Sequence, residues 1–223
     1  MAEVPPEFSF YPSEPEKKIR RIPPRVLMLV LNYVPGTDAE RIVQVAESAL
    51  RGGVNWLMLR VRELPAPLCL DLAMELRRLT RKHNALLGVN PSPALAEWSE
   101  ADALHLPEHA PFHPPLEGAL LGRSVHSVSA AQRAAAEGCH YLLVGTLYPT
   151  RSHPDQMPAG LPLLQAVRAA VALPLIAIGG ITPERVTACL QAGAQGVAVI
   201  SGIVDAPEPE TAARHYWIAL TER

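Results

Sequence analysis

The sequence is poor in cysteine, and its few cysteines lie far apart. Cys69, Cys139 and Cys189 form no CxxC pair and no Cys/His cluster, which argues against a disulfide framework and against a zinc site. Isolated free cysteines are usually small buried side chains rather than catalytic thiols. We therefore expect a protein of the reducing cytoplasm.

Long apolar runs and an excess of one charge are lacking as well. Stretches such as Val26 to Leu31 are too short to span a hydrocarbon core of about 30 Å. The 20 Lys and Arg residues nearly balance 22 Asp and Glu residues, so the chain lacks the positive field that nucleic acids and anionic membranes attract. We expect neither of these partners, and a small-molecule ligand fits better. The oligomeric state stays open, with a homodimer as one option.

The first 24 residues differ in composition from the rest of the chain. They are rich in Pro, Glu, Lys and Arg, and they lack the continuous apolar segment of a secretory signal. This composition predicts a flexible arm over 1–24. A single domain over 25–223 is expected to follow it, because about 200 residues suffice for one sizeable core.

Short apolar runs alternate with longer segments of helical spacing after the arm, which is typical of βα units around a buried parallel sheet. Eight strands are predicted, at Val26–Leu31, Val54–Arg60, Leu86–Asn90, Ala103–Leu106, Leu120–Val125, Tyr141–Val144, Leu175–Ile178 and Gly196–Ile200. Six helices are predicted from three- and four-residue spacing, at Asp38–Arg51, Pro67–His83, Ser129–Glu137, Pro162–Ala172, Pro183–Ala192 and Pro209–Leu220. Eight alternating units predict a single (β/α)8 TIM barrel with a short N-terminal extension.

Glycine-bearing loops follow the last two predicted strands. Gly179-Gly180 comes directly after one strand, and Ser201-Gly202 after the other. In a β/α barrel the ligand site lies at the carboxyl ends of the strands, and phosphate is frequently bound by the last two loops. Glycines let the backbone amides approach an anion closely. We therefore predict a phosphate site here, although ordinary tight turns would give the same pattern.

The residue pattern resembles the superfamily of thiamine phosphate synthases and thiazole tautomerases from about Val26 to the C-terminus. The signatures that carry the resemblance are Gly52-Gly53-Val54 with Leu59-Arg60, His105-Leu106, Gly122-Arg123-Ser124-Val125-His126-Ser127, Tyr148-Pro149-Thr150, and Ala177-Ile178-Gly179-Gly180-Ile181-Thr182-Pro183. The synthase joins a pyrimidine diphosphate to a thiazole phosphate on a barrel. The resemblance implies that a thiazole phosphate would be held by Thr150, Gly180 and Ser201 with neighbouring backbone amides.

Further ligand contacts are expected along the same strand ends. The candidates are Arg60, Arg62, Asn90, Ser124, Thr146, Gly179 and Gly202. Arg60, Arg62 and Arg123 are the residues that could bind a phosphate or carboxylate, because a guanidinium can hold either group through two hydrogen bonds. Salt bridges across the barrel rim are the alternative role for these three arginines.

The half of the site that would hold the diphosphate departs from the synthase pattern. The family's Asn-Asp after the third strand stands here as Asn90-Pro91, a later Asp as His109, and a loop Lys as His153. The family uses those carboxylates for magnesium, which prefers oxygen ligands that neither proline nor histidine replaces. We therefore expect no metal site and no cofactor, with magnesium involved only if the protein is a synthase.

The losses favour a metal-independent, tautomerase-like enzyme that moves a proton on a thiazole carboxylate phosphate. Such a reaction needs a general base. The tautomerase described for this branch carries a histidine where this chain has Thr146, so His126 and His153 are the candidate catalytic residues. A structural role for His126, as a ring that bonds a loop carbonyl, stays open. Two other hypotheses also stay open: a synthase with a rebuilt diphosphate site, and a non-catalytic binding or regulatory protein.

Overall fold

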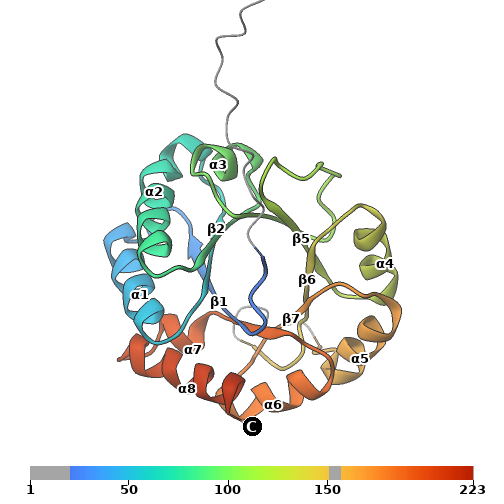
Figure 1. Ribbon diagram of the computed structural model, residues 1–223. Helices are drawn as coiled ribbons and strands as arrows, with labels where there is room; N and C mark the ends of the chain where they lie inside the picture. Colours follow the sequence, from blue (N-terminus) through green and yellow to red (C-terminus); the bar gives the residue numbers. More distant parts are fainter. Residues whose placement is uncertain (1–20, 151–156, 223) are drawn as a thin grey trace, which may run out of the picture.

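The structure, a computed structural model, describes residues 21–150 and 157–222. Eight parallel strands close into a barrel in the order β1 to β8 (Figure 1). The strands are β1 (Val26–Tyr33), β2 (Trp56–Val61), β3 (Leu86–Asn90), β4 (Ala103–Leu106), β5 (Leu120–Val125), β6 (Tyr141–Val144), β7 (Leu175–Ile178) and β8 (Gly196–Val199). The predicted (β/α)8 TIM barrel is therefore confirmed.

Helices surround the barrel in Figure 1. They are α1 (Ala39–Arg51), α2 (Ala66–Lys82), α3 (Pro93–Trp98), α4 (Val128–Ala136), α5 (Gly160–Ala170), α6 (Pro183–Gln191), α7 (Ser201–Val204) and α8 (Pro209–Thr221). The six expected helices form with small shifts of their ends, whereas the short helices α3 and α7 were not expected. Residues 107–119, all of them described, form no helix between β4 and β5.

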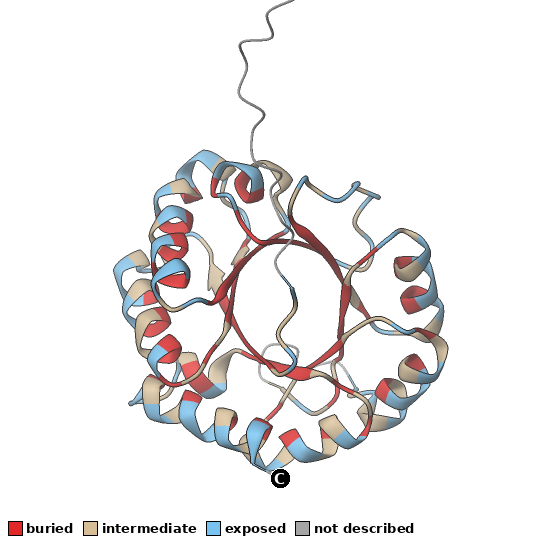
Figure 2. Ribbon diagram, viewed as in Figure 1, coloured by how far each residue is buried: buried red, intermediate tan, exposed pale blue. Residues whose placement is uncertain are grey.

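Two apolar layers account for the closure of the barrel. On β1 the side chains of Val26, Met28 and Val30 fill the barrel interior. Leu27 and Leu29 belong to the layer between the strands and the helices. Alternate strand residues point to opposite faces, so a continuous apolar run serves both layers. Figure 2 shows the result, with buried strands inside and helices buried only along their inner faces.

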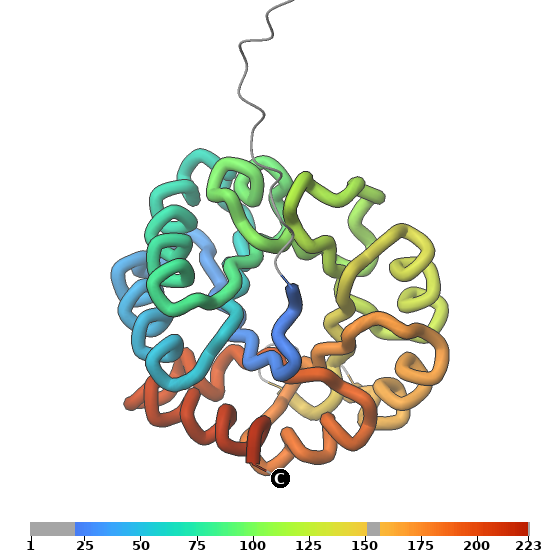
Figure 3. The backbone as a smooth tube through the Cα atoms, viewed as in Figure 1, coloured from blue at the N-terminus to red at the C-terminus, as the bar shows by residue number. Residues whose placement is uncertain are grey.

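The chain closes one opening of the barrel just before β1. Residues 21–25 cross this opening in Figure 3, and Ile22 packs against the interior cluster. The carbonyl oxygen of Pro23 accepts a bond from Gln195 Nε2 at 2.6 Å. A ligand site must therefore open at the other end, where the strands finish. The expected arm lies mostly in residues 1–20, which are outside the described residues, and it stays a prediction.

The three cysteines are buried and free. Burial raises the pKa of each thiol, in the case of Cys189 to about 11, which keeps the thiols protonated and unreactive near neutral pH. In the part of the chain that the structure describes, no helix is long and apolar enough to cross a membrane.

Candidate active site

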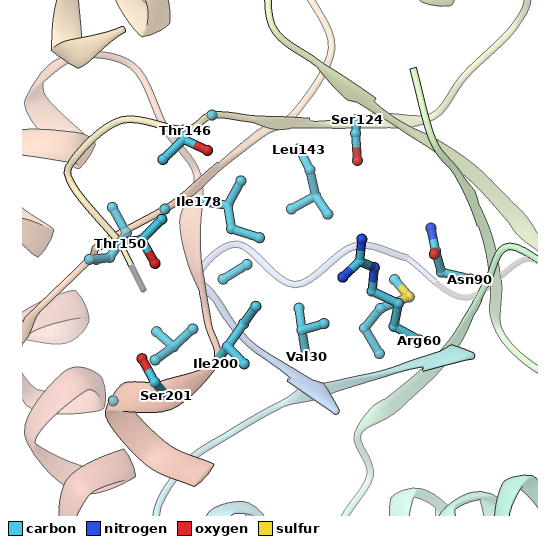
Figure 4. A pocket seen from close by; sticks show the side chains of 18 of the residues that line it. Val30, Arg60, Asn90, Ser124, Leu143, Thr146, Thr150, Ile178, Ile200 and Ser201 are labelled. Atoms are coloured by element: carbon cyan, nitrogen blue, oxygen red, sulfur yellow. The ribbon is translucent and has the colours of Figure 1, made fainter. Parts of the chain in front are cut away.

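A pocket opens at the carboxyl ends of the strands, and most of the predicted site residues line it (Figure 4). The predicted residues found there are Arg60, Asn90, Ser124, His126, Thr146, Thr150, Gly179, Gly180, Ser201 and Gly202. Apolar side chains complete the walls, among them Val30, Leu143, Ile178 and Ile200. The barrel thus brings together predicted site residues that are up to 142 positions apart in the sequence, from Arg60 to Gly202.

The β7–α6 loop at one end of the pocket requires glycine at position 180. Gly180 has a φ of +62°, and a Cβ there would lie 2.4 Å from the carbonyl oxygen of Pro149. The amide of Tyr148 also donates to the carbonyl of Gly179 at 3.0 Å. The loops after β6 and β7 are therefore in backbone contact, and a side chain at Gly180 would force them apart.

Hydroxyl groups and small residues complete this end of the pocket. In Figure 4 Thr150 and Ser201 lie on the same side of the cavity. Gly202 follows at the start of α7, where a Cβ would lie 2.2 Å from the hydroxyl oxygen of Tyr216. That hydroxyl donates to the carbonyl of Ile181 at 2.9 Å. Exposed amides and hydroxyls beside closely packed glycines can accommodate a phosphate group.

Arg60 occupies the opposite side of the pocket. Figure 4 shows its guanidinium beside Asn90, across the cavity from Thr150 and Ser201. Arg60 is in register with Asn32 of β1 and with Asn90 of β3, and its Nη1 donates to Asn32 Oδ1 at 3.3 Å. Within the described residues no carboxylate forms an ion pair with Arg60. Its positive charge is therefore available for an anion.

Ser124 is held by a buried histidine. His105 Nε2 lies 2.9 Å from Ser124 Oγ, and His105 Nδ1 lies 3.2 Å from the hydroxyl of Tyr141. Burial, with a smaller effect of the nearby Arg123 charge, lowers the pKa of His105 to about 3. His105 is consequently neutral near pH 7. It orients the Ser124 hydroxyl through a hydrogen bond and does not act as a general acid at that pH.

His126, a predicted catalytic residue, is paired with a carboxylate. Oε2 of Glu108 accepts bonds from the His126 amide at 2.6 Å and from His126 Nδ1 at 2.8 Å. The structural role that the sequence left open for His126 was a bond from its ring to a loop carbonyl. The ring bonds instead to the carboxylate of Glu108. Glu108 was not predicted to contribute, although a carboxylate just after a barrel strand is a recognisable signal.

The remaining candidates lie elsewhere. Arg62 is exposed and is not part of the pocket lining, and its role in binding stays a prediction. His153 lies outside the described residues, so its role stays a prediction as well. Arg123 is only 1% exposed and donates to the carbonyls of Pro107 and Ala110. The structure therefore gives Arg123 a structural position rather than a ligand contact.

The described lining does not fit a magnesium ion. It contains no Asp and no Glu, and among the described residues no group of three His, Cys, Asp or Glu side chains could hold a metal. Asn90 supplies only a neutral amide, and its Nδ2 donates to the carbonyl of His105 at 3.0 Å. Magnesium is usually held by at least one carboxylate together with water and phosphate oxygens, and the described pocket lining offers no carboxylate.

Comparison with known proteins identifies the family. A family model described as thiamine monophosphate synthase matches residues 27–203. A thiamine-phosphate synthase of Natronomonas pharaonis is 41% identical over 179 residues, which are 77% of this chain and 84% of the relative. A thiamine-phosphate synthase of Roseiflexus castenholzii is 39% identical over 196 residues, which are 85% of this chain and 86% of the relative.

Solved structures agree with this relationship. A thiamine phosphate pyrophosphorylase from Pyrococcus furiosus superimposes with a TM-score of 0.77 at 27% identity, covering 88% of this chain and 96% of that one. A 3-hexulose-6-phosphate synthase reaches a TM-score of 0.66 at 15% identity, covering 88% of this chain and all of that one. The second likeness shows the fold alone.

These findings overturn the tautomerase hypothesis. Curated relatives at 35–42% identity are named as thiamine-phosphate synthases, some of them as putative ones, so the synthase alternative is supported and the tautomerase-like assignment was wrong. The family model and the named relatives carry this correction, because the lost metal carboxylates alone do not separate the two branches. By its sequence and its fold, the chain belongs to the thiamine monophosphate synthase family.

Proposed function

We propose that the protein is a thiamine-phosphate synthase, which joins a pyrimidine carrying a diphosphate to a thiazole phosphate. The observation that carries the proposal is the two-sided pocket. Thr150 and Ser201 lie on one side and Arg60 on the other, with apolar walls between them. Two anionic groups can thus be held apart while two flat heterocycles meet in the middle.

The thiazole phosphate is assigned to the side formed by the glycine loops. Its phosphate would accept bonds from the hydroxyls of Thr150 and Ser201 and from backbone amides at Gly180 and Gly202, all of which line the pocket. Such contacts fix the position of the ring nitrogen relative to the second substrate.

The diphosphate is assigned to the side of Arg60. In the proposed reaction the bond between the pyrimidine methylene carbon and the diphosphate oxygen breaks, and its electron pair leaves with the diphosphate. The thiazole nitrogen then supplies the pair that forms the new carbon–nitrogen bond. A guanidinium held by Asn32 at 3.3 Å would stabilise the departing negative charge.

Direct measurement of the product tests this function. The purified protein is incubated with both phosphorylated precursors, and thiamine phosphate and pyrophosphate are quantified by chromatography and mass spectrometry. Arg60→Ala should lower kcat/KM for the diphosphate by about 100-fold, as expected for loss of a charge-assisted contact. Arg41→Ala, on the exposed face of α1, is the matched control and should retain full activity.

The outcomes separate the hypotheses. Product formation that depends on Arg60 supports the synthase. Tight binding of thiazole phosphate without any product would favour a non-catalytic binding protein. The cytoplasmic location belongs to the same proposal and is supported by three free, buried cysteines, and a homodimer stays a prediction.

A further inference from the structure

The β4–β5 connection is fixed by a buried arginine although it contains no helix. Arg123 Nη1 donates to the carbonyl oxygens of Pro107, Glu108 and Ala110 at 3.3, 3.1 and 2.8 Å. Its Nη2 lies 3.0 Å from Glu137 Oε2. Three backbone bonds to one buried cation hold the start of this connection in place.

Glu108 belongs to this fixed segment and bonds to His126, which lines the pocket. Its side chain is only 12% exposed, and Oε2 accepts bonds from both the amide and the ring of His126. Burial raises the pKa of the Glu108 carboxyl, but the bonds and charge of His126 outweigh that effect and hold the pKa below its ordinary value. Glu108 is therefore ionised near neutral pH.

The pair fixes the orientation of the His126 ring. With Nδ1 bonded to Glu108 at 2.8 Å, Nε2 is the ring nitrogen left for a ligand, and His126 lines the pocket. A carboxylate behind Nδ1 is an arrangement that orients imidazole and stabilises its protonated form. No described carboxylate lines the pocket, and a ring with a free Nε2 can meet charge that develops on a leaving group.

We propose that His126 donates a proton from Nε2 to the departing diphosphate and that Glu108 is the positioning residue for that transfer. The inference rests on the proposed synthase function. The carbon–oxygen bond breaks, its electron pair stays on the diphosphate oxygen, and the proton from the imidazolium neutralises part of the charge there. His126 ends as neutral imidazole and regains a proton from solvent after pyrophosphate leaves.

Several charged and titratable groups surround this ring. Glu108 contacts it directly, and His109 Nε2 lies 3.7 Å from the other Glu108 carboxylate oxygen. Arg60 on β2 and the neutral His105 on β4 line the same pocket. Glu108 provides the negative charge in direct contact with the ring, so Glu108→Gln removes the carboxylate that orients it.

Steady-state kinetics over the range from about pH 5.5 to about pH 9 test the transfer, because imidazole changes charge within that range. We compare the full-length protein with His126→Asn and Glu108→Gln. His109→Asn is the matched control, since His109 is 88% exposed on the same loop and is not part of the pocket lining.

In the wild type, kcat should fall as pH rises through neutrality, because the acid must be protonated. His126→Asn should lower kcat about 100-fold and abolish this pH dependence, while the KM for thiazole phosphate stays unchanged. Glu108→Gln should lower kcat about tenfold, because the ring loses the carboxylate that orients it, while the KM for thiazole phosphate stays unchanged. His109→Asn should match the wild type.

Binding of inorganic pyrophosphate, measured by calorimetry, gives a readout that does not need turnover. The affinity of the wild type for pyrophosphate should weaken more steeply with rising pH than the affinity of His126→Asn. Measuring both proteins in the same buffers corrects for the ionisation of pyrophosphate itself. His126→Gln serves as a second variant, because either amide can still donate to Glu108 and preserve the fold.

The two proposals fail in different ways. If the wild type forms thiamine phosphate while His126→Asn keeps its kcat and its pH dependence, the synthase function stands and the proton transfer is refuted. If the wild type forms no product under any condition, both are refuted. If both His126 variants fold and bind pyrophosphate with the same pH dependence as the wild type, the assignment is also overturned.

Discussion

Arg185 Nη1 donates a hydrogen bond of 2.6 Å to the carbonyl oxygen of Gly180. Arg185 belongs to the first turn of α6 and is not part of the pocket lining. The same guanidinium lies 4.5 Å from the ring centroid of Tyr148, whose backbone packs against Gly180. One cation thus connects the loops after β6 and β7, on which the proposed phosphate contacts depend.

Replacing Arg185 should loosen the phosphate loops without unfolding the barrel. Arg185→Ala removes both the bond to Gly180 and the contact with Tyr148, so we expect the affinity for thiazole phosphate to fall about tenfold. Calorimetric titration measures the effect. Arg214→Ala is the control, because Arg214 is exposed on α8 and pairs with Glu210, and an unchanged affinity in Arg185→Ala would refute the role.

A methyl group at Gly180 tests the close approach of the loops. Gly180→Ala places a Cβ 2.4 Å from the Pro149 carbonyl oxygen, so the loops must separate and the affinity for thiazole phosphate should fall by at least about tenfold. Gly138→Ala is the matched control, since Gly138 also has positive φ, +82°, but nothing lies within 4 Å of its Cβ position.

The control isolates the effect of backbone conformation. Both variants place a side chain in left-handed backbone, so both should lose about 1 kcal/mol of unfolding free energy in urea denaturation from this cause, and Gly180→Ala should lose more because its Cβ also meets the Pro149 carbonyl. Only Gly180→Ala should lose affinity. Equal binding by the two variants would show that the contact between Gly180 and Pro149 does not shape the site.

The strands and the main helices could be predicted because their sequence signals are local. Val26–Leu31 and Tyr141–Val144 are apolar runs whose two faces are both buried, and Asp38 caps α1 by accepting from the amides of Glu40 and Arg41. The glycine loops at Gly180 and Gly202 were recognisable for the same reason. Glycine after a buried strand indicates close backbone approach wherever it occurs.

The supporting contacts could not be predicted because they depend on how far side chains reach in the folded state. Arg123 lies in a signature of the resemblance and was a candidate anion ligand, yet it turns away from the pocket and binds backbone carbonyls. Nothing in the spacing of Glu108 and His126, 18 positions apart, indicates that they touch. The tautomerase hypothesis failed for a different reason, because the loss of a few carboxylates was given more weight than the similarity to the synthases along the rest of the chain.

Acid should destabilise the protein through His105. Burial lowers the pKa of this histidine to about 3 from an ordinary value of 6.5, so between these values the unfolded chain binds a proton that the folded state does not. The unfolding free energy should therefore fall as pH drops below about 6.5, by up to about 1.4 kcal/mol per pH unit from this residue. Urea denaturation at a series of pH values measures the slope.

A pair of variants assigns that slope to one side chain. His105→Gln removes the buried imidazole, so its stability should depend less steeply on pH between about 4 and about 6 than that of the wild type. His113→Gln changes an exposed ring that bonds only to the carbonyl of Pro114 among the described contacts, and its slope should equal the wild-type slope. If His105→Gln retains the full slope, other groups are responsible.

Chelation of divalent metal should leave catalysis largely intact. The described pocket offers Arg60, His126 and the Asn90 amide but no carboxylate, and a hard cation would gain little there beyond its contacts with the substrate. We therefore expect rates of thiamine phosphate formation in EDTA and in magnesium to agree within about twofold. Arg60→Ala, by contrast, should become more responsive to magnesium, because the diphosphate then lacks its protein cation. A wild-type rate that vanishes in EDTA and returns with magnesium would contradict this view, because the charge on the leaving group would then be met by metal rather than by Arg60.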